Sequence, residues 1–271
     1  MDIFTINQDT CTQCGICADV CHLGIIDFQE NNYPRPFPEV TEKMCSKCGA
    51  CLVFCPTDSF MHRDIPLEQC PQIDDSLLIN YNQSAQLIKA RRSIRDFKDK
   101  PVPRKDIEQI IDAARYAPTG ANLQNVQWLV FDDGEVVEQF RTAGTEFIRR
   151  IAASPGAAPL KDIWDKRREL GIDDLMHGAP VIVAAYSHKD TMAAEVNALI
   201  ALAYFDVVAT TMGLGCCWLG FFTAAANNFP PIKKVVGLPE DHIIHEALAV
   251  GYPKYKRYRI PQRNPAQITW K

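Results

Sequence analysis

The sequence predicts an α+β protein built in two parts, a small cysteine-rich domain followed by a larger domain of mixed helices and strands. The first observation is that eight of the 11 cysteines fall between Cys11 and Cys55. The second is that helical stripes begin to alternate with β-branched and aromatic runs near residue 85. A chain of 271 residues is long enough to give each part its own core.

The cysteines of the first part form two copies of one motif, C-x2-C-x2-C-x3-C. The copies are Cys11, Cys14, Cys17 and Cys21, then Cys45, Cys48, Cys51 and Cys55. Two-residue gaps let a tight loop present three thiolates to one face of an iron–sulfur cubane. The repeat therefore predicts two [4Fe-4S] clusters. Zinc and disulfides are the alternatives, but structural zinc sites use paired C-x2-C units, and disulfides belong to exported proteins.

Residues 1–62 resemble the bacterial two-cluster ferredoxins through these spacings and through Pro56, which follows the last cysteine. The resemblance implies crossed ligand sets, because the fourth cysteine of each copy binds the cluster of the other. One cluster is then held by Cys11, Cys14, Cys17 and Cys55, and the other by Cys45, Cys48, Cys51 and Cys21. His22 stands where that family usually has proline, and a structural role is expected for it.

The second part begins at residue 85, after a connector over 63–84. A stripe of Ile107, Ile110, Ile111 and Ala114 predicts a helix over 103–116. Residues 152–175 combine prolines and glycine with a charged stretch, so an insertion or mobile cover is expected there. The other expected elements are strands over 126–131, 180–186, 216–222 and 245–252, and a long apolar helix over 193–212.

Four segments of this part carry groups suited to a phosphorylated ring compound. The guanidinium forks of ARRSIRDF suit a phosphate, and the amides of APTGANLQNVQW suit the edge of a pyrimidine-like ring. The glycines of MGLGCCWLGFF let backbone lie against a flat ring, and GYPKYKRYRIP adds cations. Taken singly, each segment has a plain alternative, such as a solvated basic turn.

Together and in this order, the four segments resemble the FMN-dependent nitroreductase family over roughly residues 85–271. The resemblance implies an α/β sandwich with a mixed sheet flanked by helices, assembled as an intertwined homodimer with FMN at the interface. The implied FMN contacts are Arg91, Arg92, Ser93, Arg95, Arg257 and Arg259 at the phosphate, Pro118, Thr119, Gly120, Asn122 and Gln124 along the ring and ribityl chain, and the backbone N–H of Leu219 or Gly220 at flavin N5.

The two resemblances imply an FMN-dependent oxidoreductase. An external low-potential donor such as ferredoxin is expected to reduce the clusters, and the clusters the FMN, which then reduces a small electron-poor nitroaromatic, quinone or enone. NAD(P)H is the alternative donor. Two other classes stay open: an electron-transfer or redox-sensing flavoprotein without small-molecule turnover, and dehalogenating or flavin-fragmenting chemistry.

Bulk properties narrow the partners and the location. The formal net charge of −4 gives no reason to expect nucleic acid or an anionic membrane as a partner. No apolar run reaches the length of about 18 residues that predicts a membrane helix. The N-terminal MDIFTINQDTC lacks the basic start and apolar stretch of a signal peptide, so a cytoplasmic protein is expected.

Overall fold

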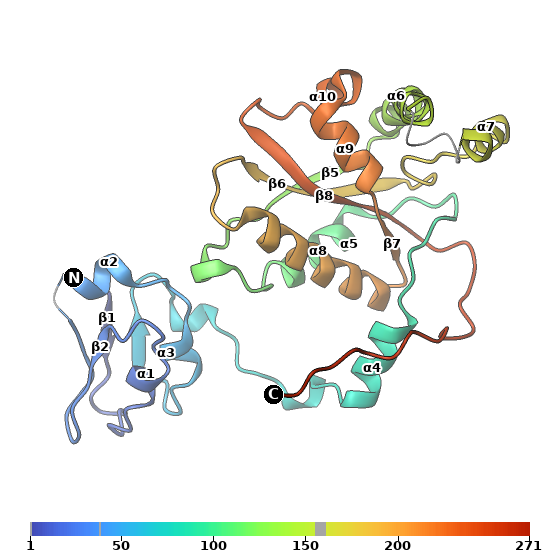
Figure 1. Cartoon of the computed structure of the whole chain (residues 1–271). Coiled ribbons are helices and arrows are strands. Elements are labelled where there is room, and N and C mark those ends of the chain that lie inside the picture. Colours follow the sequence, from blue (N-terminus) through green and yellow to red (C-terminus); the bar gives the residue numbers. More distant parts are fainter. Residues whose placement is uncertain (1, 38, 155–160) are drawn as a thin grey trace. The chain divides into compact units, whose positions relative to one another are not determined.

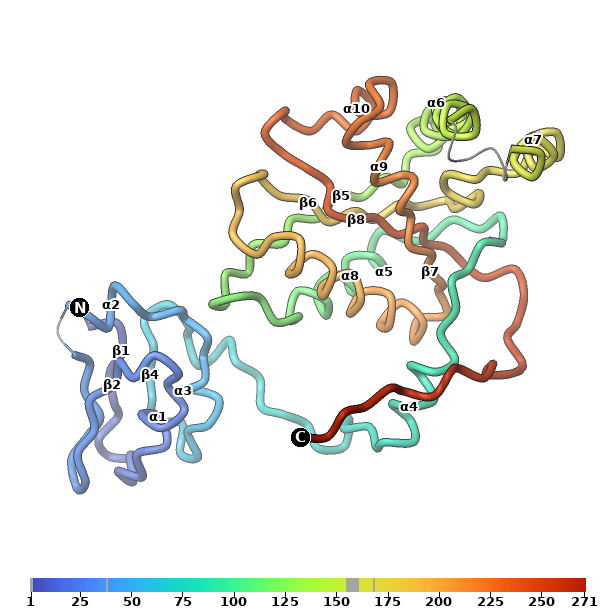
Figure 2. Tube along the Cα trace, in the orientation of Figure 1, coloured from blue at the N-terminus to red at the C-terminus, as the bar shows by residue number. Residues whose placement is uncertain are grey.

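A computed structural model describes residues 2–37, 39–154 and 161–271 of the chain (Figure 1, Figure 2). The chain divides into two compact units. The first consists of Met1–Leu78 together with Gly120–Leu123, and the second of Ile79–Thr119 and Gln124–Lys271. The main division therefore falls inside the expected connector, 63–84.

Short antiparallel ladders and short helices make up the described part of the first unit. Its elements are β1 (Phe4–Ile6), α1 (Ile16–Asp19), β2 (Ile26–Asp27), β3 (Arg35–Pro36), α2 (Val40–Met44), α3 (Ala50–Val53), β4 (Phe60–His62), the 3-10 turns η1 (Leu67–Gln69) and η2 (Asp75–Leu77), and η3 (Gly120–Asn122). β1 pairs with β4, and β2 with β3. The rings of Phe4 and Phe60 are stacked with centroids 4.5 Å apart and lie in a small hydrophobic core. Domains with so small a core usually depend on metal or disulfides for stability.

The second unit is built on a four-stranded sheet in the order β5-β6-β8-β7. Its elements are α4 (Tyr81–Ala90), α5 (Arg104–Ala114), β5 (Gln127–Phe131), α6 (Gly134–Ala152), α7 (Lys161–Glu169), β6 (Val181–His188), α8 (Ala194–Thr211), β7 (Gly215–Trp218), α9 (Gly220–Asn228), α10 (Pro230–Val236) and β8 (His242–Gly251). Every neighbouring pair in this sheet is antiparallel. A mixed sheet, as expected, would include at least one parallel pair of strands. The described pairings of this sheet include none.

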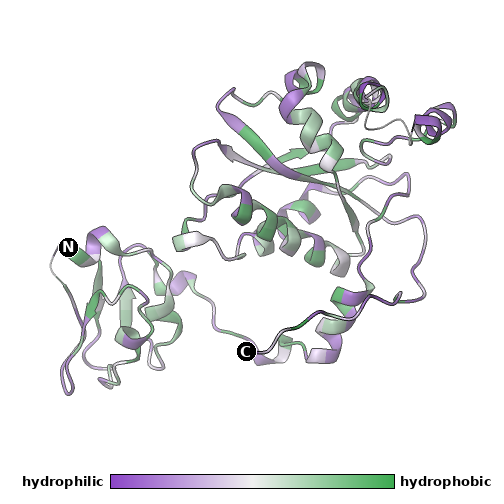
Figure 3. Ribbon diagram, in the orientation of Figure 1, coloured by the Kyte–Doolittle hydropathy of each residue, from purple (hydrophilic) through white to green (hydrophobic). Residues whose placement is uncertain are grey.

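Helices cover both faces of the sheet, as Figure 1 shows for α5 and α8 on one face and for α6, α9 and α10 on the other. The alternation of β6 explains the two layers, since Ile182 and Ala184 enter one core while Val181 and Val183 enter the other. The buried stretches 181–185 of β6 and 247–250 of β8 are therefore continuous apolar runs. The hydrophilic α7 stands out in Figure 3 and is held by a ring contact between Trp164 and Phe221, with centroids 6.2 Å apart.

Most expected elements agree with the structure to within a few residues. The stripe over 103–116 is α5, and the apolar run over 193–212 is α8. The strand predicted over 216–222 is wrong in its second half, because β7 ends at Trp218 and α9 begins at Gly220. Helical spacing explains the difference, since α9 buries Phe222, Ala225 and Ala226, at i, i+3 and i+4, on one side. The expected cover over 152–175 contains α7, and residues 155–160 lie outside the described part.

Among the described residues, α8 alone is long and apolar enough, by length and composition, to cross a membrane. It packs against the sheet and α5 through buried Ala198, Leu202 and Phe205. The core helix of a folded domain passes the same test of length and composition. Val196 and Tyr204 on this helix stay exposed.

Gly215 provides a test of how closely the chain packs along β7. A Cβ at this position would lie 2.4 Å from Cγ1 of Ile94 and 3.0 Å from Pro253. We expect Gly215→Ala to lower the free energy of unfolding by about 1–3 kcal/mol, because overpacking forces its neighbours apart. Gly134→Ala is the matched control, since its Cβ meets nothing within 4 Å. Equal urea-unfolding midpoints for the two variants would contradict the packing argument.

Candidate functional site

The eight motif cysteines surround two cavities in the first unit. Cys45, Cys48 and Cys51 of the second copy share one cavity with Cys21 of the first copy. Cys11, Cys14 and Cys17 of the first copy share the other with Cys55 of the second copy. The structure thus brings together the same sets of four that the crossed arrangement requires. Among the described residues, no group of three or more His, Cys, Asp or Glu is arranged to hold a single metal ion, as zinc would need.

The loops around these cavities have a backbone that few residues other than glycine adopt. Gly15 and Gly49 precede α1 and α3 with φ of 77° and 75°. A Cβ at Gly15 would lie 2.6 Å from the ring of Phe28. Backbone N–H groups are directed at sulfur, from Lys47 to Cys45 at 3.4 Å and from Ser59 to Cys55 at 3.2 Å. This geometry suits an anionic metal–thiolate group.

Burial shifts the pKa values of thiols in both cavities. Burial, reinforced by the neighbouring thiols, raises the pKa of Cys17 to about 11 and that of Cys51 to about 12. Burial opposes ionisation at Cys55 as well, but N–H groups of Thr57, Ser59 and Phe60 lower its pKa. Iron binds thiolates, so cluster uptake must release protons from the buried thiols.

In the second unit, the segment around Arg91–Lys98 lies beside β7 and the chain that follows β8. Ile94 N–H donates to the Cys216 carbonyl at 2.9 Å, and Lys98 N–H donates to the Tyr252 carbonyl at 2.8 Å. These bonds place the arginine cluster, which is Arg91, Arg92 and Arg95, next to the glycine-rich segment around β7 and next to the chain that leads to the C-terminal cations. Arg257 reaches the same place, with its Nη1 3.4 Å from the Ala90 carbonyl.

Arg91 is fixed by a buried carboxylate that sequence reasoning missed. Its Nη1 donates to Oδ2 of Asp206 on α8 at 3.1 Å, and Trp218 Nε1 donates to the same oxygen at 3.1 Å. The Asp206 side chain is 4% exposed, and its Oδ1 has no hydrogen-bond partner in the described structure. Burial raises the pKa of Asp206, and Arg91 opposes that rise only in part. The one available signal was an acid in the middle of an apolar helix.

The other expected phosphate residues lie along the same stretch. Arg92 Nη1 donates to the Arg91 carbonyl at 2.7 Å. Ser93 and Arg95 lie beside Cys217, where they oppose the rise that burial causes in the pKa of its thiol. Arg259 lies in the exposed C-terminal segment.

Of the two backbone groups expected at flavin N5, the structure leaves one available. Leu219 N–H donates to the Ala247 carbonyl at 2.9 Å, and the residue is buried. Gly220 is the first residue of α9, where helix N–H groups have no intrahelical acceptor. Nothing lies within 4 Å of the position that a Gly220 Cβ would take, so a flat ring has room to approach the backbone.

The segment over 118–124 is divided between the two units, since residues 120–123 belong to the first unit and the residues on either side to the second. Pro118 is exposed, and Thr119 Oγ1 accepts the backbone N–H of Gln124 at 3.0 Å. Thr119 and Gln124 line a cavity together with Trp128 of β5, and the lining includes none of Arg91, Arg92, Ser93 or Arg95. In the first unit, which includes Gly120 and Asn122, the Asn122 amide donates to the Ser46 and Lys47 carbonyls at 3.0 and 2.9 Å. Within the second unit, Thr119 and Gln124 therefore do not share a cavity with the arginine cluster.

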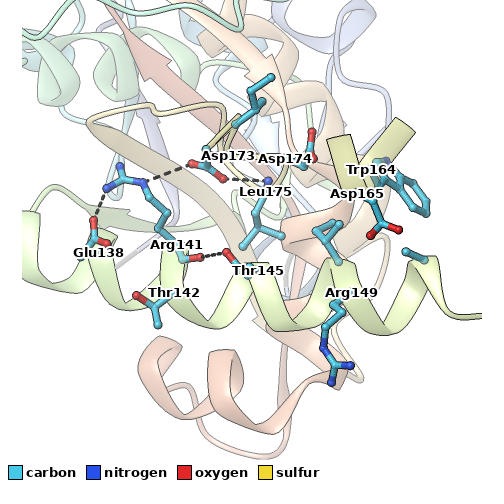
Figure 4. A pocket seen from close by; sticks show the side chains of 15 residues that line it. Glu138, Arg141, Thr142, Thr145, Arg149, Trp164, Asp165, Asp173, Asp174 and Leu175 are labelled. Atoms are coloured by element: carbon cyan, nitrogen blue, oxygen red, sulfur yellow. Dashed lines mark hydrogen bonds and ion pairs between the residues drawn. The ribbon is translucent and has the colours of Figure 1, made fainter. Parts of the chain in front are cut away.

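A further cavity of about 430 Å³ lies between α6, α7 and residues 171–175 (Figure 4). Arg141, on its wall, is paired with Glu138 and lies 3.7 Å from an oxygen of Asp173. Asp173 also accepts the backbone N–H of Leu175 at 3.0 Å. The other charged groups of its lining are also ion-paired, Arg149 with Glu146, Asp165 with Lys161 and Asp174 with Arg167. None of the sequence-predicted site residues lines the cavity.

Two family models match the chain in the order of its two parts. Residues 10–59 match the 4Fe-4S dicluster domain, and residues 88–252 match the nitroreductase family. Cysteine loops and a helix-covered sheet thus define an iron–sulfur oxidoreductase. The second match covers more than half of the chain, and the chain belongs to the nitroreductase family.

Known relatives and solved structures resemble the second part. A protein of Archaeoglobus fulgidus, provisionally named NADH dehydrogenase/NAD(P)H nitroreductase, is 27% identical over 68% of this chain and 94% of its own length. The iodotyrosine deiodinase of Thermotoga neapolitana is 24% identical over 65% of this chain and 91% of its own. The solved nitroreductase of Desulfitobacterium hafniense with bound FMN is 22% identical, with a TM-score of 0.56 over 71% of this chain and 99% of its own. This last likeness establishes the fold.

The raised pKa of the buried Asp206 carboxyl predicts how the stability of the protein depends on pH. A carboxyl whose folded pKa is raised above its ordinary value of 3.8 stabilises the fold less as pH rises from that value through the folded pKa. Asp206→Asn removes this titration. We therefore expect the stability of the variant, relative to wild type, to improve as pH rises above about 4, by about 1.4 kcal/mol for each unit of raised pKa. Asp132→Asn, at the exposed Arg104 pair, is the control. Urea unfolding from pH 4 to 8 measures both, and a trend of opposite sign would show that the pKa of Asp206 is lowered.

Proposed function

We propose that the chain is an FMN-dependent oxidoreductase fed by its own iron–sulfur domain. Electrons from an external low-potential donor such as ferredoxin enter through two [4Fe-4S] clusters, pass to FMN, and reduce a small electron-poor substrate such as a nitroaromatic, quinone or enone. The observation that carries this proposal is the presence, in one nitroreductase-family chain, of two cavities that each gather four cysteines. Such clusters exchange single electrons, and FMN when bound supplies both one-electron and two-electron chemistry.

The chain's own residues would hold FMN at both ends. Arg91, oriented by Asp206, presents its remaining N–H groups to the phosphate, with Ser93 and Arg95 on the same stretch. At the other end, the Gly220 N–H at the start of α9 would donate to flavin N5. A bound FMN in the solved nitroreductase of Desulfitobacterium hafniense supports this assignment.

A homodimer would complete the FMN site. Thr119 and Gln124 lie apart from the arginine cluster within one chain, so they would serve the FMN of a second copy. Exposed apolar side chains supply a surface for that copy; they are Tyr81 and Ile88 of α4, Val196 and Tyr204 of α8, and Tyr255, Tyr258, Ile260, Ile268 and Trp270 after β8. Thiols used for cluster ligation suit a reducing compartment, which supports a cytoplasmic location.

Two relatives support alternatives within the same framework. The FMN reductase [NAD(P)H] of Bacillus subtilis, 25% identical over 67% of this chain, supports NAD(P)H as a second candidate donor. The iodotyrosine deiodinase of Thermotoga neapolitana supports reductive dehalogenation of an aromatic ring as a second candidate reaction. Turnover of a panel of nitroaromatics, quinones and halogenated phenols distinguishes the two reactions, and saturable turnover of any of them excludes a flavoprotein that only carries or senses electrons.

The phosphate site predicts a difference between FMN and riboflavin, which lacks the phosphate. We expect Arg91→Ala to weaken FMN binding about 10- to 100-fold, since a hydrogen bond to a charged group contributes about 1.5–3 kcal/mol. Riboflavin affinity should change less than about twofold. Arg104→Ala, at an exposed arginine paired with Asp132, is the control and should leave both affinities unchanged. Quenching of flavin fluorescence measures them, and an equal loss of both ligands would place Arg91 outside the phosphate site.

The proposed route predicts that loss of one cluster blocks electrons from a protein donor. In Cys48→Ser, anaerobic stopped-flow with reduced ferredoxin should show FMN reduction slowed at least about 100-fold, because electron transfer needs the cluster ligands. FMN content and direct photoreduction of the flavin should match wild type. If NADPH alone reduces wild-type FMN as fast as ferredoxin does, the clusters are not the entry point.

A further inference from the structure

His62 is a buried histidine that neither resemblance assigns. It ends β4, is 6% exposed, and lines the cavity of Cys45, Cys48, Cys51 and Cys21. Its Nε2 lies 3.6 Å from Sγ of Cys45. We propose that His62 donates an N–H···S hydrogen bond to Cys45 and makes the cluster at this cavity the one of higher reduction potential. The inference rests on the proposed clusters and states which of the two has the higher reduction potential.

The backbone decides which nitrogen of His62 carries the proton. Asp64 N–H donates to Nδ1 of His62 at 3.1 Å, so Nδ1 is an acceptor without a proton. In a neutral imidazole the proton then lies on Nε2, which faces Cys45. Asp64 is held in turn by ion pairs of its carboxylate with Lys47 at 2.8 Å and Arg63 at 2.9 Å. The imidazole therefore has one orientation and one tautomer.

The other set of cysteines has no equivalent donor among the described residues. Both sets receive backbone N–H groups, from Lys47 to Cys45 and from Ser59 to Cys55, where the N–H groups of Thr57 and Phe60 also act. Among described side chains, the Cys55 set has the Thr57 hydroxyl, 3.9 Å from the Cys55 sulfur. Both histidines of the first unit stand at the Cys45 set, because Nδ1 of the exposed His22 lies 4.0 Å from Cys48 Sγ. In side-chain donors, the two cavities thus differ chiefly in one buried, oriented imidazole at the Cys45 set.

A donor directed at a ligand sulfur acts on the charge of the cluster. Reduction adds negative charge, part of which resides on the thiolates, and an N–H···S bond stabilises that charge. Hydrogen bonds to the sulfurs are among the factors that set the potential of such clusters. Because His62 is buried, water cannot replace the donor when the side chain is removed. Electrons entering the domain would therefore settle on the cluster beside His62.

The test is the potential of each cluster in anaerobically purified full-length protein. We expect His62→Phe to shift the equilibrium constant for electron exchange between the two clusters about tenfold toward the Cys11 set, which corresponds to about 59 mV for a one-electron couple. Potentiometric titration followed by EPR measures the shift, and hyperfine-shifted cysteine β-proton NMR signals assign it to a cluster. His22→Phe is the matched control and should shift the constant less than twofold. His62→Gln keeps an N–H donor at a similar reach and should recover part of the shift.

Three outcomes would overturn the inference. The first is iron-replete His62→Phe with both potentials unchanged, and the second is an equal shift of both clusters. The third needs no variant: pulsed EPR of the reduced wild type should detect an exchangeable proton and an imidazole nitrogen coupled to one cluster, and their absence counts against the bond even where His62→Phe loses iron. A chain that takes up no iron overturns the proposed function as well, whereas a failure of FMN binding leaves these potentials and their test intact.

Discussion

The convergence of four thiols from two distant stretches of chain is the constraint on which the first unit depends. Cys21 lies with the Cys45 loop and Cys55 lies with the Cys11 loop, so each cavity is lined by cysteines from both copies of the motif. The apolar core around Phe4 and Phe60 is small, and five of the motif cysteines pack against it. A metal–thiolate group at each crossing would therefore stabilise the fold as well as carry electrons.

In the second unit, the central interaction is between a buried carboxylate and the Arg91 guanidinium, beside the edge strand β7. Asp206 lies within α8, receives Arg91 and Trp218 on one oxygen, and leaves the other without a partner. Burial of this carboxylate opposes its ionisation and is compensated only in part. Such a cost at a site is typical of a group retained for function, because a well-packed apolar residue would stabilise the helix more. The same stretch of chain, running along β7, places Ser93 and Arg95 nearby.

The proposed function divides one-electron and two-electron chemistry between the two units. An iron–sulfur domain accepts single electrons, and a flavin collects them for a substrate that needs two. Hydride transfer from NAD(P)H would instead deliver both electrons in one step. A cluster pair with unequal potentials would give electrons a preferred location before they leave the domain, and the contact of His62 with Cys45 would be the structural basis for that inequality.

The sequence by itself determined what local spacing encodes. Cysteine intervals predicted the two cluster loops, and the stripe of Ile107, Ile110 and Ala114 predicted α5, because both patterns lie within a few turns of chain. Only the tertiary structure decided which groups meet across long separations. The pairing of Arg91 with Asp206, 115 residues apart, and the use of the Leu219 N–H by Ala247 follow from how helices and strands cross, and no periodicity records such contacts. For the same reason, the tautomer of His62 became visible only when β4 and its turn were folded against Cys45.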